Sequence, residues 1–126
     1  MIVGIGTDLV EVKRVEKLLK DKERFRDHMF TDGEITACDG NFRAAEKYAA
    51  RFAAKEAAVK ALGTGLRGGI EWRDIELLND ELGKPSLHFH GKAKKLADSL
   101  GVTGSFVSIS HLKDYATAVV VLEGER

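Results

Sequence analysis

The chain has 126 residues, and its 20 basic and 20 acidic side chains give a formal net charge of zero. A chain of this length can bury a real hydrophobic core, and we expect a single domain over residues 1–126. The balanced charge argues against a nucleic-acid or membrane-surface protein, and the longest apolar run, 116–122, is too short to span a bilayer. Because Cys38 is the single cysteine and the N-terminus lacks a secretion-signal pattern, we expect a cytoplasmic protein.

Residues 1–8 are predicted to form a buried strand whose end carries a carboxylate. Gly4, Gly6 and Asp8 alternate with larger residues, so they share one face of the strand. Glycines on that face allow a ligand or another backbone to approach closely. Asp8 has two interpretations: it caps the next helix, with Glu11 completing a capping box, or it offers its carboxylate to a ligand.

The segment from about 10 to 20 has the pattern of an amphipathic helix with a basic outer face. Its apolar positions follow the helical period, and lysine and arginine residues line the opposite side and extend beyond the helix. This basic stripe consists of Lys13, Arg14, Lys17, Lys20, Arg24 and Arg26. Such a stripe is either a solvated surface or a docking face for an acidic partner, for which charge mainly raises the association rate.

The middle of the chain is predicted to contain a short capped helix followed by a long one. Thr31 and Glu34 have the spacing of a capping box, and a turn at 38–40 ends the short helix. From about 42 to 62 the composition favours a helix, because Ala, Leu, Lys and Glu have high helix propensity. Gly63 is predicted to end it as a C-cap, and the glycines after this negative helix end are not a phosphate-binding loop.

Glu56 occupies an unusual position in the long helix. On a helical wheel it lies in the middle of an apolar side, whereas the other side carries Lys47, Arg51 and Lys55. A carboxylate on an inward face is costly unless a positive charge compensates it. Lys60 lies about 40° round the helix from Glu56, one turn later. The compensating group is therefore this lysine, a metal ion, or both.

The C-terminal half is predicted to form two hairpins and one more helix. The strands are predicted at 74–78, 86–90, 105–110 and 115–122, and the helix at 92–100. The apolar run 118–122 shows no alternation, so we expect both faces of this last strand to be covered.

Asp8, Glu56 and Lys60 together have the residue types of a phosphate-handling metal site. Two carboxylates without a cysteine or histidine partner suit a hard cation with oxygen ligands, Mg²⁺ rather than Zn²⁺. Such an ion completes its shell with water and phosphate oxygens, and a nearby lysine can neutralise a phosphate leaving group. The alternative is a Glu56–Lys60 helix pair worth roughly 0.2–0.5 kcal/mol, with Asp8 only capping. The residues alone leave these two interpretations even.

Five motifs occur in order along nearly the whole chain. They are G-T-D-L-V at 6–10, F-T-x-x-E at 30–34, R-F-A-A-K-E-A-x-x-K-A-L-G-T-G at 51–65, G-K-P at 83–85 and S-I-S-H at 108–111. In spacing and chain length they resemble the holo-acyl carrier protein synthase family, the small bacterial type of 4′-phosphopantetheinyl transferase. The block around Glu56 is the most specific of the five.

The resemblance implies an α+β fold, with a small antiparallel-rich sheet packed against a long central helix and shorter helices. It also implies a homotrimer with active sites at subunit interfaces. The implied reaction moves the 4′-phosphopantetheine group of coenzyme A to a serine of apo acyl carrier protein and releases adenosine 3′,5′-bisphosphate, for fatty acid biosynthesis.

The resemblance also implies roles for individual residues. Asp8 and Glu56 would hold Mg²⁺ against the coenzyme A pyrophosphate, and Lys60 would contact the phosphates and help the leaving group. The remaining contacts to coenzyme A would come from His111 in its pocket and from Gly63, Gly83, Lys84 and Pro85 near the nucleotide. The acidic carrier protein would bind Arg14, with Lys13, Lys17 and Arg24 beside it.

Two other functions are weighed against this transferase. The first is a non-catalytic module that binds coenzyme A or a carrier protein, which would have the same stripe and pocket but no turnover. The second is a nucleic-acid binder using residues 13–26; the zero net charge and the lack of interleaved aromatic residues argue against it. For the transferase itself, the sequence leaves the general base open between Glu56 and a metal-bound water.

Overall fold

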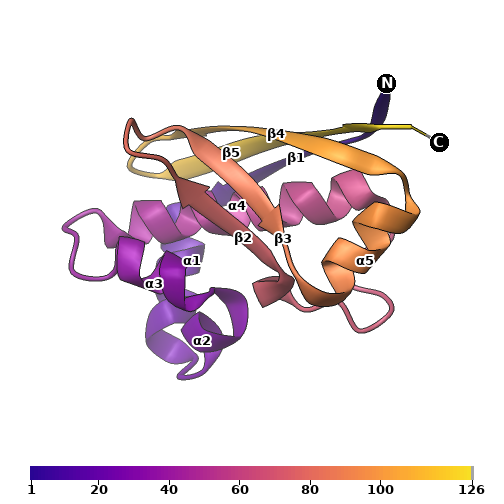
Figure 1. Cartoon of the computed structure of the whole chain (residues 1–126). Helices are drawn as coiled ribbons and strands as arrows, with labels where there is room; N and C mark the ends of the chain where they lie inside the picture. Colours follow the sequence, from indigo (N-terminus) through magenta and orange to yellow (C-terminus); the bar gives the residue numbers. More distant parts are fainter. Residues whose placement is uncertain (126) are drawn as a thin grey trace.

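The computed structural model describes residues 1–125, which form five helices, five strands and one short 3-10 helix (Figure 1). In chain order these are β1 (Ile2–Glu11), α1 (Val12–Asp21), α2 (Phe25–Met29), α3 (Asp32–Cys38), α4 (Ala44–Leu62), η1 (Trp72–Asp74), β2 (Ile75–Asn79), β3 (Pro85–Phe89), α5 (Gly91–Ser99), β4 (Val102–His111) and β5 (Tyr115–Gly124). Every predicted element is present, and only its ends differ by a few residues. None of the described helices combines the length and apolar character that a membrane span requires.

The strands form two antiparallel sheets around the long helix α4. One sheet has the order β1-β5-β4, and the other is the β2-β3 hairpin. Figure 1 shows α4 running along one face of the three-stranded sheet, with the hairpin and α5 beside it. All described pairings are antiparallel, which confirms the expected mixture of helices with small antiparallel sheets.

Two glycines of β1 allow α4 to pack directly against the sheet. A Cβ added to Gly4 would overlap the carbonyl oxygen of Ala61, and one added to Gly6 would overlap that of Ala57. The sequence left open whether a ligand or a backbone approaches these glycines, and the backbone of α4 does so. Because Asp8 shares their face of the strand, this packing points its side chain towards α4.

The interpretation of Asp8 as a helix cap is wrong. The strand continues to Glu11 because β5 extends the ladder, with Asp8 paired to Ala118 and Glu11 to Tyr115. Helix α1 therefore begins only at Val12, its N-cap residue is Glu11, and that side chain makes no capping hydrogen bond. The carboxylate of Asp8 is left available for another role.

Helix α4 is covered on the side opposite Glu56 as well, because α3 and β2 pack against it. Arg51 is buried there, and Lys55 is fully buried. The Nζ atom of Lys55 lies 2.7 Å from Oε1 of Glu34, whose capping box with Thr31 is confirmed. Burial lowers the pKa of Lys55, and the Glu34 carboxylate opposes that shift. This ion pair joins α3 to α4.

The outer face of the three-stranded sheet is apolar and exposed in the single chain. Since Gly4 and Gly6 face α4, the residues between and beyond them point outward. The exposed apolar residues of these three strands include Ile5 (65%), Leu9 (67%), Phe106 (58%), Tyr115 (50%) and Val119 (40%). The prediction that both faces of the last strand are covered is therefore wrong for one chain. An apolar patch of this kind marks an interaction surface.

Candidate active site

Strand β1 and helix α4 bring Asp8, Glu56 and Lys60 together. The Nζ atom of Lys60 lies 3.1 Å from Oδ1 of Asp8 and donates a second hydrogen bond, of 3.0 Å, to the carbonyl oxygen of Thr7. Among the described residues Asp8 is the ion-pair partner of Lys60, and Glu56 is not. The structural alternative of a Glu56–Lys60 helix pair is therefore wrong.

The environment of Glu56 disfavours its negative charge. Burial raises the pKa of Glu56, and the neighbouring Asp8 carboxylate raises it further, while Lys60 and Arg14 oppose the shift. No hydrogen bond from the described part of the chain reaches the Glu56 carboxylate, which is half-buried. The site thus holds two close carboxylates whose charges are incompletely compensated, and an additional cation would relieve their repulsion.

The donor set fits Mg²⁺ better than a transition metal. Asp8 and Glu56 supply hard carboxylate oxygens and not the nitrogen or sulfur ligands that transition metals prefer. Residues 1–125 contain no cluster of three or more acidic, histidine or cysteine side chains, so the protein itself offers only these two ligands here. A site with two carboxylates suits Mg²⁺, which keeps several waters or accepts substrate oxygens. The assignment of Mg²⁺ to this pair stays a prediction.

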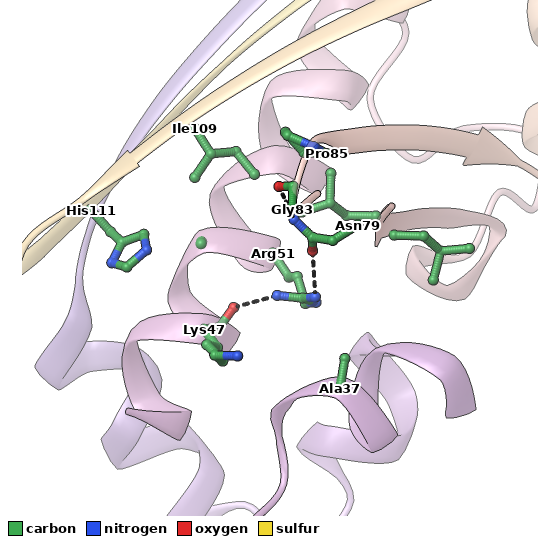
Figure 2. Close-up of a pocket in the computed structure, with 11 residues that line it drawn as sticks. Ala37, Lys47, Arg51, Asn79, Gly83, Pro85, Ile109 and His111 are labelled. Carbon is green, nitrogen blue, oxygen red and sulfur yellow. Dashed lines mark hydrogen bonds between the residues drawn. The ribbon is translucent and has the colours of Figure 1, made fainter. Parts of the chain in front are cut away.

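A second feature is a cavity of about 510 Å³ between α4, the β2–β3 turn and the end of β4 (Figure 2). Gly83, Pro85 and His111, three of the residues that the resemblance assigns to coenzyme A, line this cavity. Lys84 is exposed and is not among the lining residues, although its backbone N–H donates to Asp80 and fixes the turn. Gly63 lies elsewhere, as the left-handed C-cap of α4 with φ of 81°.

The cavity contains cationic residues that sequence reasoning missed as site residues. Lys47 and Arg51 line it together with His111. Arg51 donates to Oδ1 of Asn79 at 3.0 Å and to the carbonyl oxygen of Lys47 at 3.4 Å, and its buried Nε has no described partner. A buried guanidinium with a spare donor, an ammonium group and an imidazole can together bind an anionic ligand. The sequence did place Lys47 and Arg51 on the side of the helical wheel opposite Glu56, and this was the feature that could have identified them as site residues.

The cavity and the carboxylates lie on different sides of α4. Arg51 and Glu56 are separated by about 140° around the helix axis. Their contacts agree with this separation, because Arg51 reaches Asn79 of β2 whereas Lys60 reaches Asp8 of β1. One chain therefore presents two separate sites, one acidic with a lysine and one cationic.

The basic stripe begins beside the carboxylates. Lys13, Arg14 and Lys17 are exposed on α1, and Arg24 is exposed just before α2. The guanidinium carbon of Arg14 lies 5.7 Å from the ring centroid of Phe52, one turn before Glu56 on α4. A partner that docks on this stripe would therefore lie next to the carboxylate pair.

Comparison with known proteins places this geometry in a family. Residues 4–120 match the 4′-phosphopantetheinyl transferase superfamily, ACPS type. The chain is 49% identical to the holo-[acyl-carrier-protein] synthase of Geobacter sulfurreducens, with 98% of each chain covered. It is 46% identical to the Koribacter versatilis protein of the same name, with 98% of this chain and 99% of that one covered.

Solved structures agree with these relatives. The holo-[acyl-carrier-protein] synthase of Neisseria meningitidis matches with a TM-score of 0.88 and 36% identity, over 98% of this chain and 99% of the other. The Bacillus anthracis synthase, solved in complex with coenzyme A (3′,5′-ADP), matches with a TM-score of 0.79 and 42% identity over 99% of each chain. The chain belongs to the 4′-phosphopantetheinyl transferase superfamily and, within it, to the holo-[acyl-carrier-protein] synthase family.

Proposed function

We propose that the protein transfers the 4′-phosphopantetheine group of coenzyme A to a serine of apo acyl carrier protein. The products would be holo acyl carrier protein and adenosine 3′,5′-bisphosphate, and the role would be fatty acid biosynthesis in the cytoplasm. The observation that carries the proposal is the grouping of Asp8, Glu56 and Lys60 on a rigid strand and helix, beside the basic stripe. Relatives named holo-[acyl-carrier-protein] synthase support the same activity.

In the proposed reaction the side chains of this cluster handle phosphate charge. Asp8 and Glu56 would hold Mg²⁺, which when bound supplies positive charge to the transferring phosphoryl group. The serine oxygen would attack the β-phosphorus in line, and the bond to the departing adenosine bisphosphate would break. Lys60 would neutralise charge on that leaving group. Glu56 or a nearby water would accept the serine proton.

The cationic cavity would bind another part of coenzyme A. Lys47, Arg51 and His111 can pair with its phosphate groups, and the turn that carries Lys84 and Pro85 borders the same space. The basic stripe, with Arg14 next to the carboxylates, would bind the acidic carrier protein and hold its serine near Glu56.

We further propose that the protein is a homotrimer. The exposed apolar outer face of the sheet, with Ile5, Leu9 and Val119, would be buried between copies. Contact between copies would also bring the cavity of one chain to the carboxylate pair of the next, which α4 separates within a chain. Sedimentation should give about three times the 13.8 kDa chain mass, and Val119→Asp should give monomers with little activity. A fully active wild-type monomer would contradict the proposal.

A mass assay tests the transfer itself. Incubating the protein with coenzyme A, Mg²⁺ and an apo carrier protein should raise the carrier's mass by that of the phosphopantetheine arm. A carrier whose modified serine is replaced by Ala is the control and should gain nothing, as should a reaction containing a chelator. No mass gain with several apo carriers would sink the proposal. Binding of coenzyme A without turnover and without dependence on Mg²⁺ would favour the non-catalytic module instead.

A further inference from the structure

Glu46 makes a contact with His111 that none of the proposed roles uses. Glu46 lies in the first turn of α4, and His111 is the last residue of β4. The Nδ1 atom of His111 lies 3.0 Å from Oε1 of Glu46, and the Glu46 side chain is only 16% exposed. The contact spans 65 positions of the sequence and connects the start of the helix to the end of the strand.

This contact determines which nitrogen of His111 faces a ligand. An ionised carboxylate can only accept hydrogen bonds, so Nδ1 of the imidazole must carry a proton and donate it. No hydrogen bond from residues 1–125 occupies the other nitrogen, Nε2. His111 forms one wall of the cationic cavity, across from Lys47 and Arg51 (Figure 2). Nε2 is therefore the ring nitrogen left to meet a ligand: it accepts a hydrogen bond from the ligand when the ring is neutral, and it donates one to a phosphate oxygen when the ring is protonated.

Glu46 has two opposing effects on an anionic ligand. Its negative charge repels the anion, whereas its hydrogen bond removes the rotational freedom of the imidazole ring before binding. Glu46 is not among the residues that line the cavity, and its carboxylate is engaged by His111. The repulsion therefore acts from behind the imidazole ring and not in direct contact with the ligand. The ring orientation acts at the contact itself, so we expect it to dominate.

We propose that Glu46 is a positioning residue that holds His111 in the orientation needed to bind coenzyme A in the cavity. The inference rests on the proposed function only for the identity of the ligand. Glu46 touches neither the carboxylate pair nor the reacting atoms, so its loss should raise KM for coenzyme A and leave kcat nearly unchanged.

Two substitutions separate the hydrogen bond from the charge. Glu46→Ala removes both, whereas Glu46→Gln removes the charge and keeps an amide oxygen that can accept from Nδ1. In the full-length protein, calorimetric titration with coenzyme A should show binding weakened about 3- to 10-fold by Glu46→Ala and changed less than twofold, in either direction, by Glu46→Gln. Ala and Gln are both good helix formers, so both variants should remain folded at the assay temperature, which thermal unfolding checks.

A double substitution shows whether Glu46 acts through His111. In a His111→Ala background, Glu46→Ala should have no further effect on coenzyme A binding. Equal weakening by Ala and Gln, tighter binding by Glu46→Ala, or a full effect in the His111→Ala background would each overturn the proposal. If the wild type binds coenzyme A but transfers nothing, the proposed function fails and these variants still decide the present inference. If the wild type binds no coenzyme A, both are wrong.

Discussion

Replacing Glu56 with Gln is expected to reduce transfer by about 10²- to 10³-fold, the usual cost of losing one preorganised electrostatic contact to a transition state. Gln has nearly the same shape but no charge, so the cluster loses one of its two carboxylates. The free energy of unfolding should stay the same or increase. Since burial and Asp8 raise the pKa of Glu56, its charge is disfavoured in the folded chain, and a neutral residue should fold equally well or better.

The measurement pairs the mass-based transfer rate with urea unfolding of the same preparations. Glu125→Gln is the matched control, because Glu125 is an exposed glutamate after the end of β5, away from the basic stripe and not among the cavity residues, and it should change neither quantity. A Glu56→Gln variant that keeps wild-type activity would remove Glu56 from the reaction. A loss of activity that parallels a loss of folded protein would instead assign Glu56 a structural role.

The sequence predicted the elements of the carboxylate site but not their arrangement. Alternation in β1 put Asp8 on the glycine face, and the helical wheel put Glu56 on an apolar side, so both side chains could be picked out. Excluding the Glu56–Lys60 helix pair required knowing that Lys60 reaches Asp8 across the α4–β1 contact. That contact depends on close backbone packing at Gly4 and Gly6, and the sequence indicated only that something approaches there.

Other features could not be predicted because pattern methods treat charged residues as exposed. Arg51 and Lys55 lie on the polar side of the α4 wheel, yet both are buried. Asn79 on β2 accepts a hydrogen bond from Arg51, and Glu34 on α3 forms an ion pair with Lys55. The exposed outer face of the sheet was not predicted, because pattern methods treat apolar residues as covered. A continuous apolar strand predicts two covered faces, whereas the chain itself covers only the face towards α4.

Replacing Lys55 with Met is expected to destabilise the fold by about 3–5 kcal/mol, the typical cost of removing one partner of a buried ion pair. The ammonium group has three hydrogen atoms and three acceptors: Oε1 of Glu34, the carbonyl oxygen of Trp72 at 3.0 Å, and that of Ile75. Met fills the same space but leaves a buried carboxylate and two carbonyls without this donor. The free energy of unfolding in urea measures the loss, which is a large part of the 5–15 kcal/mol of an ordinary domain.

Because Lys55→Met alone could leave little folded protein, the experiment also includes Glu34→Gln and the Lys55→Met/Glu34→Gln double variant. Both groups belong to one network, so the double variant should be more stable than the sum of the single losses predicts, by about 0.5–3 kcal/mol. Strict additivity would show that the pair contributes nothing as a pair. The folded fraction of each variant should keep the wild-type KM for coenzyme A, since Lys55 lines neither the cavity nor the carboxylate site. Adjacent residues of one motif would then have separate tasks, with Lys55 holding α3 and β2 against α4 and Glu56 keeping a disfavoured charge for the reaction.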